Sequence, residues 1–269
     1  MTVTSSIPPA PSLPTSVNLA GKHGLVIGIA NEHSIAYGCA KAMRALGAEL
    51  AVTYLNEHAE PWVRPLATEL GASIVLPCDV EKPGEMEAVF NAIQKQWGHL
   101  DFALHAVAYA PKEDLHGRVI DCSAAGFARA MAVSCHSFLR MARLAEPLMH
   151  DGGTLLTTSY YGSQKVIAHY NIMGPVKAAL EAVVRSLATE LGAQGIRVHA
   201  LSPGPILTRA ATGIEHFDEL LEQTAKTVPL HHLVTIDNVG AVAAGLVSDW
   251  AAHMTGNVVF IDGGSHVVG

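Results

Sequence analysis

Short runs of β-branched and other apolar residues alternate along this chain with longer segments that show helical spacing. Runs of this length, bounded by turn residues, are typical of buried strands. They occur at 24–30, 49–54, 73–80, 101–109, 153–159, 196–203 and 257–262. Helices are predicted at 34–47, 85–98, within 123–148, at 169–192 and at 235–249. Apolar strands joined by helices form a parallel sheet covered on both faces, so we expect one doubly wound α/β domain with about seven strands.

The rest of the chain fits this single domain, which we assign to residues 18–269. A length of 269 residues with 49% hydrophobic and only 15% charged residues is sufficient for one large core. Residues 1–17 contain four prolines and lack the basic start and apolar run of a secretory signal, so we expect a disordered tail. No apolar run reaches about 18 residues. We therefore predict no membrane span and a cytoplasmic protein.

Charge and cysteine content exclude several classes of partner. The net charge is −7 and there is no basic run, so nucleic acid is not an expected partner. The four cysteines are widely separated, which indicates reduced thiols. Fifteen histidines are present, but the adjacent pair His231 and His232 would point in different directions. We predict no metal site.

The turn after the first predicted strand is a candidate phosphate site. In doubly wound folds this turn offers backbone N–H groups and a helix N-terminus to a phosphate. Here it runs from Gly28 to Ala36 and does not have the spacing GxGxxG. Gly28 suits the tight turn, and Ser34 is placed to cap the helix and donate to a pyrophosphate. The same residues also fit a capped helix start without a ligand.

Residues at the ends of the second and third predicted strands indicate which nucleotide the protein would bind. No Arg or Lys lies between 53 and 60 to meet a 2′-phosphate, and Glu57 is near where an acid would contact ribose hydroxyls. This favours NADH over NADPH. Asp79 is placed to accept a hydrogen bond from an adenine amino group, or else it is a turn residue.

Tyr170 and Lys177 form the candidate catalytic pair. Seven residues along an α-helix return a side chain to within roughly 20° of the starting face, so both could project into one cleft. A nearby lysine favours a phenolate or a polarised phenol, and its ammonium can bind ribose hydroxyls. Tyr160 lies ten residues before Tyr170, at the carboxyl end of the fifth strand, where ligands bind in such sheets. Taken alone, the spacing is better explained by a packed tyrosine and a solvated lysine.

From about Asn18 onward, the chain resembles the short-chain dehydrogenases/reductases, and specifically the bacterial NADH-dependent enoyl-acyl-carrier-protein reductases. Those enzymes have Tyr-x6-Lys with a second tyrosine ten residues upstream, as here. Further matching segments are "SIAYG" (34–38), "CDV" (78–80), "HAVAYAP" (105–111), "YNIMGPVKAALEA" (170–182), "GIRVHALSPGPI" (195–206), "VTIDNVG" (234–240) and "IDGG" (261–264). The matches are in order and span nearly the whole chain, so together they are specific.

The resemblance implies a Rossmann domain, NADH as cofactor and a role for individual residues. The implied catalytic residues are Tyr160, Tyr170 and Lys177. The implied cofactor-binding residues are Gly28, Ser34, Ile35, Leu55, Asp79, Val80, Ala106, Val107, Ala108, Lys177, Ile206, Leu207 and Thr208. The implied substrate-binding residues are Ala110, Tyr160, Tyr170, Ile214 and Phe217. The resemblance also implies a homotetramer with interfaces on the helices at 123–148 and 169–192.

The implied reaction reduces a trans-2-enoyl thioester of acyl carrier protein or coenzyme A in fatty acid elongation. Hydride adds to the β-carbon, Tyr170 and a ribose hydroxyl stabilise the developing enolate, and protonation at the α-carbon completes the reduction. Segment 207–229 is long for a connection, and in this family it is the substrate-binding lid. Tyr160 would be a pocket wall or a member of a proton relay.

Some positions depart from the family pattern, and two other functions remain open. Leu55 replaces a polar residue near the adenosine ribose, and Ala106 and Ala108 replace a common Ser and Gly. A short-chain carbonyl or alcohol dehydrogenase acting on a small ketone needs Tyr-x3-Lys, but Gly174 occupies that lysine position. A non-catalytic NAD-binding paralogue would not need the two tyrosines and the lysine together.

Overall fold

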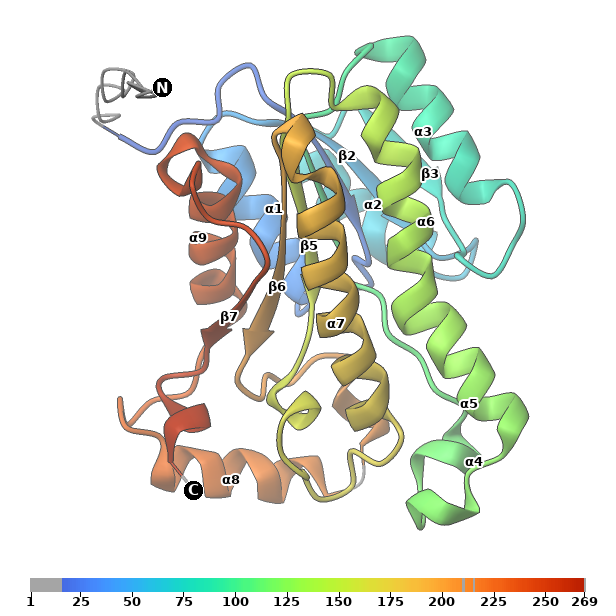
Figure 1. Cartoon of the computed structure of the whole chain (residues 1–269), viewed down its shortest axis with the longest axis vertical. Coiled ribbons are helices and arrows are strands. Elements are labelled where there is room, and N and C mark those ends of the chain that lie inside the picture. Colours follow the sequence, from blue (N-terminus) through green and yellow to red (C-terminus); the bar gives the residue numbers. More distant parts are fainter. Residues whose placement is uncertain (1–15, 210, 215, 269) are drawn as a thin grey trace, which may run out of the picture.

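The computed structural model describes residues 16–209, 211–214 and 216–268 as a seven-stranded sheet with helices on both faces (Figure 1). All strand pairs are parallel, in the order β3-β2-β1-β4-β5-β6-β7. The strands are β1 His23–Ile27, β2 Glu49–Tyr54, β3 Ile74–Pro77, β4 Phe102–His105, β5 Gly153–Thr158, β6 Ile196–Pro203 and β7 Asn257–Ile261. The predicted fold is confirmed. Of the predicted tail, all but Ser16 and Val17 lie outside the described residues.

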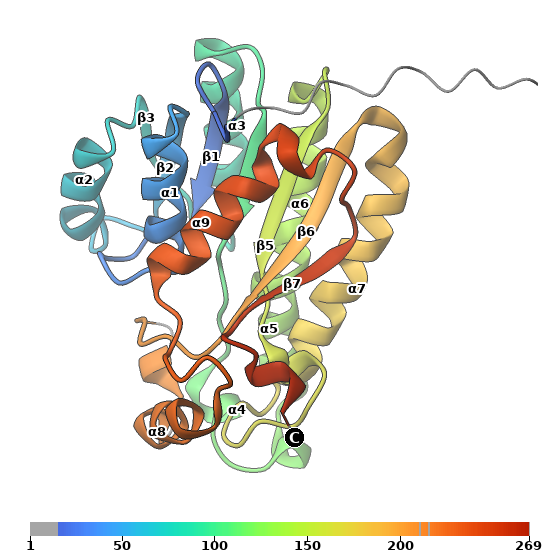
Figure 2. The same ribbon diagram turned by 90° about the vertical axis from the view of Figure 1, so that its left-hand side faces the viewer.

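Nine α-helices lie in the described part of the chain, and most of them cover the sheet. They are α1 Ile35–Ala45, α2 Glu60–Glu69, α3 Glu85–Gln96, α4 Lys112–Leu115, α5 Ala124–Met131, α6 Ser137–Ala145, α7 Met173–Leu191, α8 Phe217–Thr227 and α9 Ile236–Val247. Helices α3, α6 and α7 pack on one face of the sheet, and α1, α2 and α9 pack on the other (Figure 2). None of the described helices is long and apolar enough to span a bilayer.

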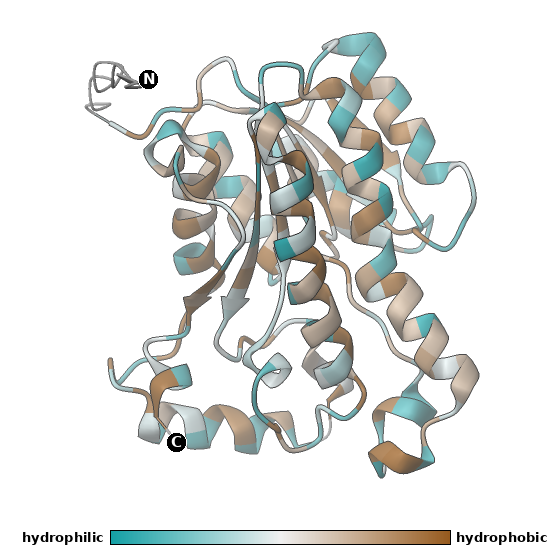
Figure 3. Ribbon diagram, viewed as in Figure 1, coloured by the Kyte–Doolittle hydropathy of each residue, from teal (hydrophilic) through white to brown (hydrophobic). Residues whose placement is uncertain are grey.

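Two cores result from this layering, one on each face of the sheet. The strands are mostly apolar, although β6 carries Arg197, His199 and Ser202, whereas α3 and α6 carry hydrophilic residues on their outer sides (Figure 3). Helices α1 and α9 approach closely because both have glycine at their contact. A Cβ at Gly38 would lie 2.3 Å from the carbonyl oxygen of Ile236, and one at Gly240 would lie 2.3 Å from that of Gly38. Any side chain at either position would force these two helices apart.

The order of the strands reverses between β1 and β4, which lie side by side at the centre of the sheet. Chain segments leaving these two strands run in opposite directions across the sheet, which opens a crevice at their carboxyl ends. Gly28 follows β1 at this point with φ of 115°, and a Cβ there would lie 2.2 Å from the carbonyl oxygen of Ala106. Glycine is therefore required for β1 and β4 to end so close together.

The long helix predicted at 169–192 begins later than expected. Helix α7 starts at Met173, and His169 and Asn171 have φ of 62° and 45°, which lies in the left-handed region and prevents a continuous helix. Tyr170 therefore lies in a turn before the helix. Our explanation that Tyr170 and Lys177 share one helix face is wrong, although both side chains still reach one cavity.

Three other elements differ from the prediction. The helix within 123–148 is interrupted by a π-turn at Ala132–His136, where Ser134 Oγ contacts both the backbone N (2.9 Å) and O (3.0 Å) of Tyr109. Helix α2 was not predicted, because its sequence includes Pro61 and Pro65. Helix α8 forms within the segment expected to be a lid.

Candidate functional site

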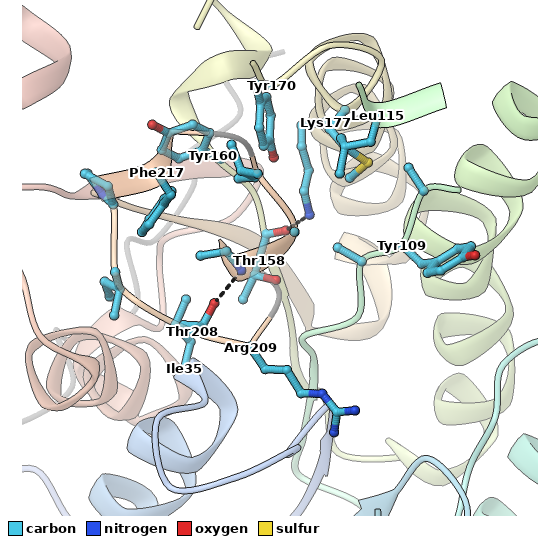
Figure 4. A pocket seen from close by; sticks show the side chains of 18 of the residues that line it. Ile35, Tyr109, Leu115, Thr158, Tyr160, Tyr170, Lys177, Thr208, Arg209 and Phe217 are labelled. Atoms are coloured by element: carbon cyan, nitrogen blue, oxygen red, sulfur yellow. Dashed lines mark hydrogen bonds between the residues drawn. The ribbon is translucent and has the colours of Figure 1, made fainter. Parts of the chain in front are cut away.

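A cavity of about 620 Å³ lies at the carboxyl edge of the sheet, beside the start of α8, and Figure 4 shows side chains that line it. Its walls come from the segments that follow β4, β5 and β6 and from the starts of α1, α7 and α8. Ten of the predicted site residues line it: Ile35, Ala108, Ala110, Tyr160, Tyr170, Lys177, Ile206, Thr208, Ile214 and Phe217. Residues far apart in the sequence are thus brought together as the resemblance implied.

Tyr170 points into this cavity from the turn before α7 (Figure 4). Its ring meets that of Tyr160 edge to face, with centroids 4.9 Å apart, and packs on Ile172 and Met173. Burial, followed by the effects of Tyr160 and Glu181, raises the pKa of Tyr170 well above its usual value. The phenolate favoured by a nearby lysine is therefore not formed here. Tyr170 is a neutral hydrogen-bond donor.

Tyr160 follows β5 and is less buried than Tyr170. Burial raises the pKa of its phenol to about 12, and Asp262 adds to this effect. Its hydroxyl points away from that of Tyr170 in Figure 4. The two tyrosines therefore present different groups to the cavity: Tyr170 its hydroxyl and Tyr160 part of its ring.

Lys177 lies one turn into α7 and is almost fully buried, with 4% exposure. Its ammonium donates to the carbonyl oxygen of Thr158 at the end of β5, at 2.7 Å. Burial lowers the pKa of Lys177 to about 8, while Cys135 and Glu181 oppose this shift. The lysine is therefore charged at neutral pH but close to losing its proton.

Glu181 lies one turn further along α7 and was not singled out from the sequence. Its exposure is also 4%, and its Oε1 accepts hydrogen bonds from the hydroxyls of Ser159 and Ser163, both at 2.6 Å. These bonds hold the segment between β5 and α7 against the helix, beside Tyr160. A carboxylate four residues after Lys177, on an otherwise apolar helix face, was the available signal in the sequence.

The turn after β1 is held by Ser34, but not in the way predicted. Ser34 occupies the N-cap position of α1 without a capping hydrogen bond from its side chain. Its Oγ instead accepts from the backbone N–H groups of Ala30 (3.0 Å) and Asn31 (3.1 Å). The expectation that the side chain caps the helix is therefore wrong. The hydroxyl shapes the loop that a phosphate would approach.

Eight predicted cofactor residues do not line the cavity: Gly28, Ser34, Leu55, Asp79, Val80, Ala106, Val107 and Leu207. Asp79 Oδ1 accepts from the backbone N of Glu81 at 3.0 Å, as a turn residue would. The carbonyl oxygen of Val80 accepts from Arg140 at 2.7 Å, whereas Leu55 and Leu207 are exposed. Their roles toward a cofactor remain predictions.

Comparisons with known proteins agree with this geometry. The sequence matches the profile of the family described as Enoyl-(Acyl carrier protein) reductase over residues 28–266. It is 47% identical to Enoyl-[acyl-carrier-protein] reductase [NADH] 1 of Rhizobium meliloti, over 93% of this chain and 92% of that protein. Identity to the corresponding NADH enzyme of Aquifex aeolicus is 44%, over 93% of both chains.

A solved structure is equally similar. The enoyl-(acyl-carrier-protein) reductase of Anaplasma phagocytophilum, solved in complex with NAD, superimposes with a TM-score of 0.91 and is 47% identical. The alignment covers 96% of this chain and 98% of that one. The family match at 28–266 includes every residue that lines the cavity. This chain belongs to the enoyl-(acyl carrier protein) reductase family.

Proposed function

We propose that this protein reduces trans-2-enoyl thioesters with NADH, as an enoyl-acyl-carrier-protein reductase of fatty acid elongation. The observation that carries the proposal is the pairing of a neutral buried phenol, Tyr170, with a buried ammonium, Lys177, in one largely apolar cavity. A carbonyl dehydrogenase would need a lysine where Gly174 stands. A non-catalytic paralogue would have no use for a buried charge of this kind.

The residues present fit NADH. An ammonium has three hydrogens, and Thr158 accepts only one from Lys177, so two are available for ribose hydroxyls. When bound, NADH supplies the hydride that adds to the β-carbon of the enoyl group. No Arg or Lys lies between 53 and 60, and Leu55 and Glu57 are exposed there. A 2′-phosphate would find no lysine or arginine in this segment, which favours NADH over NADPH.

Tyr170 stabilises the negative charge that develops during the reaction. Addition of hydride at the β-carbon moves the electron pair of the double bond toward the thioester oxygen. A neutral phenol buried among apolar side chains donates strongly to that oxygen without having to be reorganised. Addition of a proton at the α-carbon then completes the reduction. Tyr160 contributes its ring to the wall beside Tyr170.

The acyl chain would lie beneath α8. Phe217, the first residue of that helix, is buried and lines the cavity together with Ile214. Both belong to segment 207–229, which we propose as the lid of a domain that spans residues 18–269. An apolar chain here would replace water around the reacting bond.

Carrier, assembly and location are further parts of the proposal. Acyl carrier protein is acidic, and the exposed Lys165 and the cavity-lining Arg209 are candidate cations for it near the lid, with coenzyme A as the other carrier. Phe127 is exposed on α5, in the region where α5, α6 and α7 would form the interfaces of a homotetramer. We place this assembly in the cytoplasm. Sedimentation of the purified protein as a monomer would reject the tetramer.

The decisive experiment is a spectroscopic assay of NADH oxidation with crotonyl-CoA and with a longer enoyl thioester, run in parallel with NADPH. We expect oxidation that depends on the enoyl thioester and is faster with NADH. The same protein should show no oxidation with small ketones. Binding of NADH without oxidation by either enoyl thioester would reject the proposed reaction.

A further inference from the structure

A cluster of histidine and carboxylate side chains lies at the amino edge of the sheet, opposite the cavity. His23 is the first residue of β1, and Asp101 immediately precedes β4, its neighbour in the sheet. The backbone N of His23 donates to Asp101 Oδ2 at 2.8 Å, and the backbone N of Asp101 donates to the carbonyl oxygen of His23 at 2.9 Å. His99 lies two residues before Asp101. Sheet pairing therefore fixes two of the three side chains relative to each other.

The potential ligand atoms of this cluster lie at distances suited to a metal ion. His23 Nδ1 and His99 Nε2 are 3.1 Å apart, and His99 Nε2 and Asp101 Oδ2 are 3.5 Å apart. All three ligand atoms lie within 4.8 Å of one another. In a tetrahedral zinc site with bonds of about 2.0–2.1 Å, neighbouring ligand atoms are roughly 3.3 Å apart. The two short distances fall on either side of that value.

The outer nitrogens of the two histidines show which atoms carry lone pairs toward the centre. His99 Nδ1 lies 3.2 Å from the carbonyl oxygen of Trp97, which can only accept a hydrogen bond. In the neutral ring this contact favours a proton on Nδ1, which leaves the lone pair of Nε2 toward the centre. His23 Nε2 lies 3.6 Å from Glu49 Oε2, and this carboxylate favours a proton on Nε2 and a lone pair on Nδ1.

In these tautomers, lone pairs of two imidazoles and one carboxylate converge on one point. Without an ion, a proton on His23 Nδ1 or His99 Nε2 joins the two rings by a hydrogen bond of 3.1 Å, whereas with an ion both nitrogens can act as ligands. Metal-bound histidines commonly donate their outer N–H to a carboxylate or a backbone carbonyl, as His23 and His99 are arranged to do toward Glu49 and Trp97. Lys22 contacts Oδ1 of Asp101 at 3.0 Å, and Oδ2, which accepts from the backbone N of His23, keeps a second lone pair for an ion.

We propose that His23 Nδ1, His99 Nε2 and Asp101 Oδ2 bind one divalent transition metal ion of the zinc type, with water as a fourth ligand. Two imidazoles and a carboxylate form a donor set that suits Zn²⁺ and the neighbouring ions Co²⁺ and Ni²⁺. The side chain of His99 is 45% exposed, which gives an ion access from solvent. The ion would join the start of β1 to the loop between α3 and β4. The proposal differs from our prediction of no metal site, which was made from the sequence, where residues 76 positions apart form no motif.

The test is metal binding by the full-length protein without an affinity tag, stripped with a chelator and titrated with Zn²⁺ at about pH 8, where unperturbed histidines are neutral. Calorimetry should show one Zn²⁺ bound tightly per chain, and Co²⁺ should give the visible absorption of a tetrahedral site. His99→Ala should lose this tightly bound Zn²⁺. Glu49→Gln should weaken it by about 10-fold, because the outer partner of His23 is lost.

His253→Ala is the matched control, since His253 is exposed and lies outside the cluster. This variant should still bind one Zn²⁺ tightly. Zn²⁺ should also raise the thermal unfolding midpoint of the wild type but not that of His99→Ala. Enoyl reduction by His99→Ala verifies that the variant is folded. Equal Zn²⁺ binding by wild type and His99→Ala would overturn the proposal, as would no binding by the wild type at micromolar metal.

Discussion

Charged side chains are buried at one edge of the parallel sheet and partly exposed at the other. At the carboxyl edge, at the bottom of Figure 1, Lys177 and Glu181 are each 4% exposed and lie between β5 and α7. At the amino edge, at the top, Lys22 and Asp101 form an ion pair whose side chains are 42% and 21% exposed. Strands of one sheet support both groups, β5 at the carboxyl edge and β1 with β4 at the amino edge, but only the group at the carboxyl edge is buried.

The two groups differ in burial, so we expect different roles for them: shifted pKa values at the carboxyl edge, and links between chain segments at the amino edge. Burial lowers the pKa of Lys177 to about 8 and raises that of Tyr170, so the reactive groups have altered proton affinities. At the amino edge, solvent screens the charges, and the side chains act by joining chain segments or by offering ligand atoms. Substitutions at the carboxyl edge should therefore change chemistry, and those at the amino edge should change stability.

Tyr170→Phe should give the largest effect. The phenyl ring preserves the packing on Tyr160 but removes the donor to the developing oxyanion, which should lower kcat by roughly 100-fold or more. NADH affinity should change little. Steady-state kinetics with an enoyl thioester and fluorescence titration with NADH measure the two quantities. Tyr160→Phe is the matched control and should lower kcat less. An equal loss of kcat in both variants would contradict the distinct role of Tyr170.

Lys177→Met should act mainly on cofactor binding. Methionine fills a similar volume but offers no donor to ribose hydroxyls, and hydrogen bonds from a charged donor are worth about 1.5–3 kcal/mol. NADH affinity should therefore fall by roughly 10- to 100-fold. Lys95→Met, at an exposed position on α3, is the control and should bind NADH normally. Unchanged NADH affinity in Lys177→Met would remove the lysine from the cofactor site.

NADH affinity should also depend on pH through Lys177. The folded-state pKa of about 8 lies below the usual lysine value, so the ammonium is present below pH 8 and is lost as the pH rises through 8. Affinity should fall over the same range. Glu181 raises this pKa, so Glu181→Gln should move the transition to lower pH. Titrations across the pH range would show the shift; a transition that stays in place, or moves upward, would exclude this influence.

Lys177 should further affect stability with pH. Since its pKa is lower in the folded protein than in the unfolded chain, the unfolded chain binds more protons between about pH 8 and its ordinary value. The lysine contribution therefore makes the free energy of unfolding rise with pH over that window. Urea unfolding of wild type and Lys177→Met isolates this contribution, which the variant should lack.

Asp101→Asn should give the smallest effect and should leave catalysis unchanged. The substitution weakens the hydrogen bond to the backbone N of His23 and removes the ion pair with Lys22, at a cost of about 1–2 kcal/mol in the free energy of unfolding. Urea unfolding measures this loss. A fall in kcat comparable to that of Tyr170→Phe would show that the two edges are coupled.

The sequence determined the class of fold and most of the cavity. Alternating strand and helix periodicities are local properties of the chain, and they predicted all seven strands but not their order in the sheet. Tyr160, Tyr170 and Lys177 were identified from their spacing within a family pattern, and they line one cavity. Helix boundaries were less accurate, because the left-handed residues His169 and Asn171 adopt a conformation that apolar periodicity does not encode.

Tertiary structure decided the states of these side chains and the partners that lie far apart in the chain. Burial of Tyr170 keeps its phenol neutral, although a nearby lysine alone favours the opposite, because the desolvation cost of a charge depends on the whole surrounding core. Ser159 and Ser163 reach Glu181 only when β5 packs on α7. His23 meets His99 and Asp101 only when β1 pairs with β4. Local sequence specifies strands and helices, whereas proton affinity and ligand sets arise from contacts that only the folded chain makes.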